Sequence, residues 1–401
     1  MAFVSNKLTI EDVDLTNKSV LVRVDFNVPF KPGSTEISDL TRIESSLPTI
    51  RYLLHKNCKV VLCSHLGRPE GRPDEALSLR PIAFKLGELL GIHVGFVNDC
   101  VSDEAVNVTS EMTGGDIVLL ENLRFHSAEE ANDSEFARKL ANLAEFYVND
   151  AFGVSHRTHA SISRVTEYIP GVLGLLFNRE VDSLSGIFQC PVRPFTAILG
   201  GSKISDKIKV VERISGLADD ILIGGGMAAT FIKSLGHAVG NSSVEYEYLD
   251  FAKWLLSGDK NIKSRVWLAE DVVVGRDFSS DSEHKNYKIS DINERGMILD
   301  IGLGSISKFR QIIENSRTVF WNGPMGVFEW DSFAIGSKSV ATAMASQSIT
   351  SVIGGGSTVE AVSRFGLRDK MSHVSTGGGA SLQFLEGRGL PGLDAIFDRS
   401  N

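Results

Sequence analysis

The chain has 401 residues, of which 42% are hydrophobic and 23% are charged, a composition typical of a globular protein with enough apolar residues for complete cores. This length favours two domains over one. The formal net charge of −9 argues against a broad surface for nucleic acid or anionic membrane, and no apolar run approaches the ~18 residues of a membrane span.

Short β-branched apolar runs alternate with turns and helix-like stretches along the whole chain. These runs begin at Ser19, Lys59, His93, Asp116 and Phe146 in the first half, and at Phe195, Asp220, Arg265, Thr318, Ser351 and His373 in the second. Such alternation predicts parallel strands covered by helices on both faces of a sheet. Because the runs are too many for one compact sheet, we predict an α/β protein with two doubly wound, Rossmann-like domains.

The boundary between the predicted domains lies near the middle of the chain. The stretch NREVDSLSGIF, from Asn178, has the pattern of an amphipathic helix, and Pro191 and Pro194 end it before the next strand. No low-complexity linker is present, so we expect this helix to act as a hinge. The predicted division is a first domain over 1–172, a connecting helix over 173–192 and a second domain over 193–387.

Basic side chains follow the predicted strands of the first half. The arginines are Arg42, Arg68, Arg124 and Arg157, and the histidines are His65, His156 and His159. Ligands of doubly wound folds bind at the carboxyl ends of strands, so these groups are expected to converge on a small, multiply charged anion, with Asp25 and Asn27 contacting its hydroxyls. Each arginine could instead form a surface salt bridge, Asp25 could be structural, and His156 and His159 could cap turns.

Glycine-rich turns follow the predicted strands of the second half. They occupy 200–203, 224–226, 322–326, 354–358 and 375–379. Such turns let backbone N–H groups approach phosphate, and Lys203 and Lys207 are expected four residues apart on one helix face, where they could hold a polyphosphate. Glu329 is expected to accept hydrogen bonds from ribose hydroxyls. Neither a Walker A loop nor a dinucleotide-binding fingerprint is present, and a single triple glycine could merely allow close packing.

These motifs together resemble the phosphoglycerate kinase family over essentially the whole chain. The matching blocks are RVDFNVP, the helix start at Arg42, SHLGRP, ENLRF, NDAFGVSHRTHAS, ILGGSKISDKI, GGGM, NGPMGVFE and STGGGASLQFLEG. The resemblance implies reversible transfer of a phosphoryl group between 1,3-bisphosphoglycerate and ADP, giving 3-phosphoglycerate and ATP. It also implies that the triose binds the first domain, that the nucleotide binds the second with Mg²⁺, and that 388–401 returns to the first domain.

The resemblance also assigns site residues. It places the triose substrate on Asp25, Asn27, Arg42, His65, Arg68, Arg124 and Arg157. It places the nucleotide on Gly201, Lys203, Lys207, Gly302, Asn322, Glu329, Gly355, Gly356, Ser357 and Thr358. One departure concerns the metal: the family usually carries an aspartate where this chain has Ser357, and a neutral hydroxyl is a poorer ligand for a hard cation. We therefore expect Mg²⁺ to be held mainly by nucleotide phosphates and water, and Mg-ADP to bind more weakly.

The expected chemistry needs no general base, because both reacting oxygens are already anionic. The remaining tasks are alignment and neutralisation of charge on the phosphoryl group during transfer. We assign them to Arg42 and Lys203 and to the backbone amides at Gly355, Gly356, Gly378 and Gly379, with Mg²⁺. Closure of the two domains is expected to bring the ligands in line and to expel water.

Two other classes of protein compete with this interpretation. A nicotinamide dehydrogenase would need a fingerprint loop that the sequence lacks, and a hinged, non-catalytic anion-binding protein would need a secretion signal. No such signal is evident in the first residues, and the four cysteines show no CxxC spacing. We accordingly expect a cytoplasmic monomer that binds small molecules and neither nucleic acid nor membrane.

Overall fold

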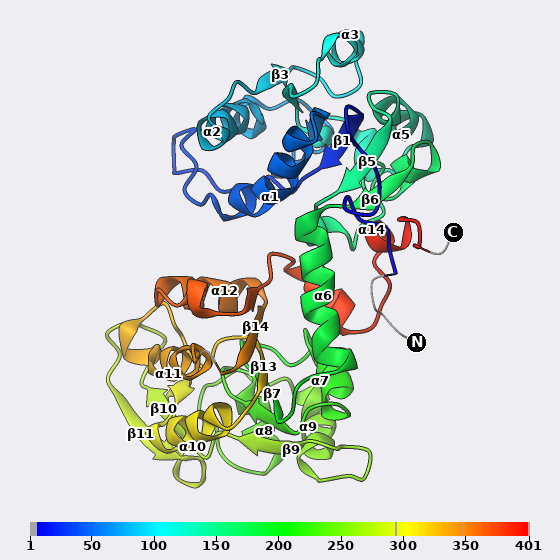
Figure 1. Ribbon diagram of the computed structural model, residues 1–401. Coiled ribbons are helices and arrows are strands. Elements are labelled where there is room, and N and C mark those ends of the chain that lie inside the picture. The colour runs from blue at the N-terminus through cyan, green and yellow to red at the C-terminus, as the bar shows by residue number, and fades with distance from the viewer. Residues whose placement is uncertain (1–5, 293–294, 347, 400–401) are drawn as a thin grey trace. The chain divides into compact units, whose positions relative to one another are not determined.

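The computed structural model describes residues 6–292, 295–346 and 348–399 (Figure 1). The chain divides into two compact units, each described separately below. Unit 1 comprises Met1–Asp182 with Gly387–Asn401, and unit 2 comprises Ser183–Glu386. The point of division falls within helix α6 (Leu175–Gln189).

Unit 1 contains a six-stranded sheet in the order β3-β4-β2-β1-β5-β6. The strands are β1 (Ser19–Arg23), β2 (Lys59–Cys63), β3 (Gly95–Val97), β4 (Ile117–Leu120), β5 (Phe146–Asn149) and β6 (Gly171–Leu173). All neighbouring strands are parallel. The chain leaves β1 toward β2 on one side and later adds β5 on the other, so the strand order reverses between β1 and β5. A doubly wound sheet opens a ligand crevice at this point.

Helices pack on this sheet and complete the core of unit 1. They are α1 (Thr41–His55), α2 (Arg80–Leu90), α3 (Asp103–Glu111), α4 (Ser127–Glu130), α5 (Ser134–Ala141) and α14 (Pro391–Asp394). In α1, Ile43, Ile50 and Leu53 are fully buried and belong to one hydrophobic cluster with Val22 of β1 and Val60 of β2. These apolar residues recur at helical spacing, which explains why α1 buries one face.

Two segments far apart in the sequence lie beside β6. The N–H of Leu173 donates to the carbonyl of Leu8 at 2.8 Å, and the N–H of Leu8 donates to the carbonyl of Phe397 at 2.9 Å. Lys7 and Asp398 form an isolated antiparallel bridge. The β6 edge of this sheet is thus covered by two segments, one around Leu8, which precedes unit 2 in the sequence, and one around Phe397, which follows it.

Unit 2 contains a second six-stranded parallel sheet in the order β15-β14-β13-β7-β8-β9. The strands are β7 (Phe195–Leu199), β8 (Asp220–Ile223), β9 (Arg265–Leu268), β13 (Thr318–Asn322), β14 (Thr350–Gly354) and β15 (His373–Val374). Here the strand order reverses between β7 and β13. A three-stranded antiparallel sheet is also present, formed by β10 (Asp271–Gly275), β11 (His284–Lys288) and β12 (Met297–Ile301).

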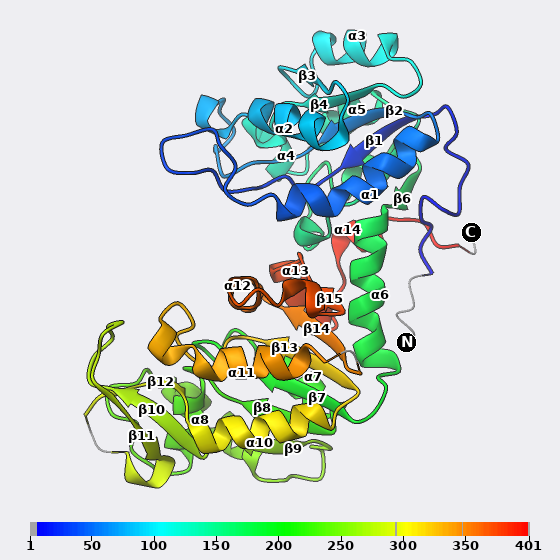
Figure 2. The same ribbon diagram turned by 60° about the vertical axis from the view of Figure 1, so that its left-hand side comes forward.

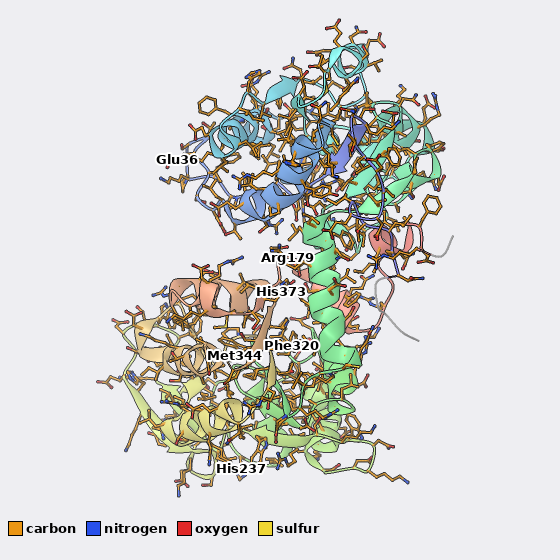
Figure 3. All side chains as sticks on the ribbon, in the orientation of Figure 1. Glu36, Arg179, His237, Phe320, Met344 and His373 are labelled. Carbon is orange, nitrogen blue, oxygen red and sulfur yellow. The ribbon has the colours of Figure 1, made fainter. Side chains whose placement is uncertain are left out.

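The helices of unit 2 are α7 (Ile208–Ser215), α8 (Ala228–Ser234), α9 (Leu249–Leu256), α10 (Leu303–Glu314), α11 (Ile335–Met344), α12 (Gly356–Arg364) and α13 (Gly379–Leu385). Helices α10 and α11 lie side by side (Figure 2). Phe320 of β13 and Met344 of α11 are both fully buried in the core (Figure 3). No helix among the described residues is both long and apolar enough to cross a bilayer.

Short 3-10 helices fill several connections in both units. They span Glu75–Leu77, Leu123–Phe125, Phe152–Val154, Arg164–Glu167, Tyr246–Tyr248, Ile289–Asp291, Asp331–Phe333 and Arg368–Lys370.

The predicted α/β class with two doubly wound parallel sheets is confirmed. Every predicted apolar run contains a strand, but sequence reasoning missed β6 and all three strands of the antiparallel sheet. The residues of β11, HKNYK, are exposed at four of five positions. A strand without a buried face carries no hydrophobic alternation, which is why the pattern gave no signal there.

Asp150, directly after β5, caps the first turn of α6. Its Oδ1 accepts hydrogen bonds from the N–H groups of Leu176 at 2.9 Å and Phe177 at 3.3 Å. Burial raises the pKa of Asp150 to about 7, while hydrogen bonds from Thr49, Phe177 and Leu176 and the charge of Arg179 oppose this rise. The folded protein therefore keeps a proton on Asp150 at pH values where the unfolded chain has released it.

The pKa of Asp150 predicts how stability changes with pH. Between about pH 4 and pH 7 the native state binds more protons than the unfolded state at this site, so the contribution of Asp150 to stability falls as the pH rises. Asp150→Asn removes this titration and keeps an acceptor for α6. We expect the variant to gain on the order of 4 kcal/mol over the wild type at pH 8 and nothing below pH 4, measured by urea unfolding. An equal difference at both pH values would contradict this interpretation.

Candidate active site

The first group of predicted site residues lies where the strand order of unit 1 reverses. Asp25 follows β1 and is 7% exposed, and Arg42 is the second residue of α1. Nη1 of Arg42 donates to Oδ2 of Asp25 at 2.6 Å. Asn27 is half-buried, and its Oδ1 accepts from the N–H of Gly67 at 2.9 Å, which ties the loop after β1 to the loop after β2.

Arg124 comes from the loop after β4 and is held by both backbone and side-chain groups. It is only 4% exposed, its Nη1 donates to the carbonyl of Gly67 at 2.7 Å, and its Nε lies 3.0 Å from Oε1 of Glu130. Asn122 caps the short helix that carries it, through a hydrogen bond from the N–H of Arg124 to Oδ1. This guanidinium is therefore fixed in the fold, whereas Arg68 lies exposed on the turn after β2.

His65 shows that several arginines converge. It is 2% exposed, and its Nδ1 lies 3.2 Å from Nη2 of Arg23. Burial and then the positive charges of neighbouring arginines hold the pKa of His65 well below its usual range. These arginines are Arg23, Arg124, Arg42 and Arg157. Three of the four arginines proposed from the sequence thus act on one neutral imidazole.

His156 and His159 belong to the same positive region. Burial, followed by the charges of Arg124, Arg23 and Arg157, lowers the pKa of His159 to about 3. Burial and Arg157 also lower the pKa of His156, while Asp25 opposes this change. Both histidines are therefore neutral near pH 7 and can act as hydrogen-bonding groups beside the arginines.

Sequence reasoning missed a buried charged layer beneath this region. Arg23 is 1% exposed and Glu129 is 0% exposed. Nε of Arg23 donates to Oγ of Ser161 at 2.9 Å, while the two carboxyl oxygens of Glu129 accept from Oγ and N–H of Ser161 at 2.6 and 2.9 Å. A signal was available, because an arginine inside the apolar strand SVLVR must find buried partners.

In unit 2, the loops after β7 and β13 meet where the strand order reverses. The N–H of Gly200 donates to the carbonyl of Asn322 at 3.0 Å, and the N–H of Gly201 donates to that of Pro324 at 2.8 Å. A Cβ on Gly200 would lie 2.3 Å from the oxygen of Pro324, and Gly323 has a φ of +97°. Only glycine permits this approach of two backbones.

The two predicted lysines follow this loop, but not as expected. Helix α7 begins at Ile208, so Lys203 and Lys207 lie in the turn before it and do not share a helix face. Glu245 binds the backbone of this turn by accepting from the N–H of Ile204 at 2.6 Å. Lys203 is exposed, whereas Nζ of Lys207 lies 3.2 Å from the position of a Cβ on Gly201. Burial lowers the pKa of Lys207, and the charges of Asp206 and Glu245 oppose this change.

The N-terminus of α12 presents the features expected of an anion site. Gly355 precedes it with a φ of +87°, and Thr358 supports it by accepting from the N–H of Gly323 at 2.7 Å. Within the described part of the chain, Nδ2 of buried Asn322 has no hydrogen-bond partner. It lies 3.0 Å from the position of a Cβ on Gly355. A buried unpaired donor beside free helix N–H groups fits a phosphate oxygen.

A pocket of about 350 Å³ opens beside these loops in unit 2. Three of the site residues predicted from the sequence line this pocket: Gly201, Glu329 and Ser357. Its apolar wall was not predicted and includes Phe278, Leu299 and Val327. The ring of Phe278, 60% exposed, lies 4.6 Å from that of Trp330.

Two further predicted residues lie outside the lining of that pocket. Gly302 precedes α10, where a Cβ would lie 2.2 Å from Oδ1 of Asn286 and 2.3 Å from Oδ2 of Asp271. Gly379 is the first residue of α13, after Gly378 with a φ of +48°. Gly302 thus has a packing role in the structure, whereas Gly379 offers an exposed helix N-terminus.

The donors in unit 2 suit phosphate better than a metal ion. Over residues 6–292, 295–346 and 348–399, one cluster of three metal-ligating side chains is present, and its residues are Asp99, Cys100 and His126 of unit 1. Beside the pocket, Ser357 offers only a neutral hydroxyl at the exposed start of α12. The N–H groups at the start of α12 and Nδ2 of Asn322 therefore fit phosphate oxygens, whereas Ser357 offers no carboxylate to a metal ion.

Comparison with known proteins gives consistent matches over nearly the full length. A family model described as "Phosphoglycerate kinase" matches residues 10–388. The chain is 47% identical over 395 residues to the phosphoglycerate kinase of Moorella thermoacetica, covering 98% of this chain and 100% of that protein. It is 47% identical over 393 residues to that of Dictyoglomus turgidum, covering 98% of each.

Solved structures agree with these matches. The phosphoglycerate kinase of Coxiella burnetii superposes with a TM-score of 0.89 at 36% identity, covering 98% of this chain and 100% of that one. That of Pyrococcus horikoshii superposes with a TM-score of 0.83 at 32% identity, covering 97% and 98%.

Proposed function

The chain belongs to the phosphoglycerate kinase family, and we propose that the arginine cluster of unit 1 and the glycine-rich loops of unit 2 bind the two substrates of that reaction. It is a phosphotransferase with a carboxyl group as acceptor, acting between 1,3-bisphosphoglycerate with ADP and 3-phosphoglycerate with ATP. The observation that carries the proposal is that Arg42 and Arg124 are held at strand ends of unit 1, Arg42 by Asp25 at 2.6 Å and Arg124 by the carbonyl of Gly67 at 2.7 Å. Their charges and that of Arg157 also lower the pKa of buried His65.

The triose is proposed to bind the arginine cluster. Arg42, Arg124 and Arg157 supply planar donors for its phosphate and carboxylate, and His65 supplies a neutral ring. Asp25 orients Arg42 through their 2.6 Å hydrogen bond. Asn27 and Arg68 complete the proposed set, Asn27 by fixing Gly67 and Arg68 as an exposed charge on the same turn.

The nucleotide is proposed to bind the pocket of unit 2. Its base suits the apolar wall around Leu299 and Val327, and its ribose suits Glu329. The phosphates are proposed to extend from Gly201 toward Asn322 and the N–H groups at Gly355, Gly356, Ser357 and Thr358, with Lys203 and Lys207 nearby. When bound, Mg²⁺ would neutralise charge on these phosphates. The packing of Gly302 against Asp271 and Asn286 argues for an indirect role there.

The reaction asks for alignment and not for proton transfer. In the direction of ATP synthesis, an oxygen of the β-phosphate of ADP forms a bond to phosphorus while the acyl oxygen–phosphorus bond breaks. The triose leaves as a carboxylate, so no proton moves. We propose that Arg42 and Lys203, with the N–H groups at Gly356 and Gly379, stabilise the charge on the phosphoryl group in flight. Closure of the units about α6 would bring the ligands in line and exclude water.

Cytoplasmic location and a monomeric state are also part of the proposal. The reaction is glycolytic, and its substrates are small molecules. Gel filtration at working concentration tests the oligomeric state.

A coupled assay tests the proposed function. With purified protein, ATP, Mg²⁺ and 3-phosphoglycerate, we expect formation of the acyl phosphate, detected through a downstream dehydrogenase. Omission of 3-phosphoglycerate is the control and should abolish the signal. A hinged anion-binding protein would bind the triose without turnover, and a dehydrogenase would bind nicotinamide instead.

Ser357→Asp is predicted to strengthen the metal-dependent part of nucleotide binding. A carboxylate at the start of α12 can coordinate Mg²⁺, so the Kd of Mg-ADP should fall by about tenfold, while metal-free ADP should bind less well because of charge repulsion. Calorimetric titration with and without Mg²⁺ measures both. Ser363→Asp, at an exposed position of the same helix, is the matched control. Equal effects of Mg²⁺ on the Ser357→Asp variant and the wild type would refute the prediction.

A further inference from the structure

A separate cluster of side chains lies in unit 1, and one of its members shares the loop after β4 with Arg124. Asp99 and Cys100 follow β3, and His126 lies just before α4, a few residues after β4. Strands β3 and β4 are parallel neighbours, so their carboxyl ends bring the two loops together. One ligand atom of each side chain lies within 4.8 Å of the other two.

The spacing of these atoms is close to that of a metal site. Nε2 of His126 lies 3.2 Å from Oδ2 of Asp99. Nitrogen and oxygen ligands about 2.0–2.1 Å from a tetrahedral Zn²⁺ lie about 3.3 Å apart, and a thiolate lies about 3.6 Å from either. The first pair thus already has the required separation, and Sγ of Cys100 needs a shift of roughly one ångström to join it.

The surrounding contacts hold two of the ligands in place. Oδ1 of Asp99 accepts from the N–H of Val101 at 2.7 Å, which leaves Oδ2 directed at His126. The ring of His126 packs against Phe136 with 5.3 Å between ring centroids. Cys100 is fully buried beneath them. Ligands oriented by outer contacts in this way are the usual arrangement at metal centres.

The cluster lines a pocket of about 490 Å³ whose charges favour a cation. Its acidic lining residues are Asp74, Glu75, Asp99 and Glu121, and its basic ones are Arg80 and His126. Arg80 is engaged with Asn98 and with the ring of Phe96. Glu121 is occupied by the N–H groups of Leu79 and Asn122 and by the hydroxyl of Ser78. The pocket leaves room for a water as a further ligand.

We propose that Asp99, Cys100 and His126 bind one Zn²⁺, with the fourth position taken by water from the pocket. A set of one nitrogen, one oxygen and one sulfur donor suits Zn²⁺ and disfavours Mg²⁺ and Ca²⁺, which prefer oxygen ligands alone. The thiol of Cys100 loses its proton to solvent as the Zn–S bond forms, and no electron is transferred. The ion would join the loops after β3 and β4 and stabilise unit 1.

Cobalt titration tests the site directly, because a thiolate bound to Co²⁺ gives a near-ultraviolet charge-transfer band. We would use the full chain, metal-free and without nucleotide, in a Cys190→Ser background that removes the exposed thiol. One equivalent of Co²⁺ should produce the band, and Zn²⁺ should displace it. Cys100→Ala should abolish the band, and His126→Gln should keep it while weakening binding by about tenfold or more.

Matched controls keep the test decisive. His93→Gln changes an exposed histidine of the same unit and should leave the titration unchanged. If Cys100→Ala fails to fold, two other measurements test the site. They are the weaker Co²⁺ binding of His126→Gln and a rise in the unfolding temperature of the parent when Zn²⁺ is added. Absence of the band in the parent, its persistence in Cys100→Ala, or equal affinity of His126→Gln and the parent would overturn the proposal and leave an ordinary His126–Asp99 ion pair beside a buried thiol.

Discussion

Arg42→Ala is expected to lower kcat by about 10²–10³-fold, with little change in the KM for ATP. Arg42 carries one of the charges proposed to neutralise the phosphoryl group in flight, and loss of one such contact raises the barrier by about 3 kcal/mol. The nucleotide is proposed to bind unit 2, which does not include Arg42. Steady-state kinetics with each substrate varied in turn measures kcat and the KM for ATP separately.

Controls for Arg42→Ala come from the same helix and the same position. Arg51→Ala removes an exposed arginine of α1 that donates to the carbonyl of Leu89, and should leave kcat within about twofold. Arg42→Lys keeps the charge but loses the planar fork, so its activity should fall between those of the wild type and the alanine variant. Wild-type kcat in Arg42→Ala would remove Arg42 from the mechanism.

Glu129→Ala is expected to destabilise unit 1 by about 3–5 kcal/mol. The substitution removes both acceptors of buried Ser161 and a carboxyl group that interacts with the charge of buried Arg23. An unpaired N–H and an uncompensated guanidinium would then remain in the interior. Urea unfolding should be followed by far-ultraviolet circular dichroism, because Trp254, Trp267, Trp321 and Trp330 all lie in unit 2 and report on that unit.

Glu135→Ala is the control for this change. Glu135 forms an exposed pair with Arg138 on α5, so its loss should cost less than about 1 kcal/mol. Glu129→Gln keeps an acceptor for Ser161 and should lie between the control and Glu129→Ala. A loss below 1 kcal/mol in Glu129→Ala would show that the buried layer does not contribute as described.

The two large sheets could be predicted from the sequence because their strands are buried on both faces. Strands such as FTAIL and TVFWN have every residue buried, so each contains consecutive apolar residues without alternation, AIL in the first and VFW in the second. The lack of such a run explains only in part why the antiparallel sheet was missed. Its β11 is polar and exposed, whereas β10 (DVVVG) and β12 (MILDI) contain apolar runs that sequence reasoning overlooked.

The candidate site was predictable where its charged side chains lie just after a strand in the sequence. Arg42, Arg124 and Arg157 act on one histidine, as strand ends of a doubly wound sheet suggest. Phe278 was not predictable, because it lies in the hairpin between β10 and β11, which the sequence did not reveal. The arrangement of Lys203 and Lys207 was predicted wrongly, because Glu245, some forty residues away in the chain, binds the backbone of the turn between them.

The hydrogen bonds that link Leu8 to both Leu173 and Phe397 have a consequence for biosynthesis. A ribosome completes all of unit 2 before it releases the segment from Gly387 onward that belongs to unit 1. While unit 2 emerges, the N–H of Leu8 in the nascent chain must therefore lack Phe397, its hydrogen-bond partner. Contacts of Lys7 and Leu8 with 396–398 can thus form only after the whole of unit 2 has been synthesised.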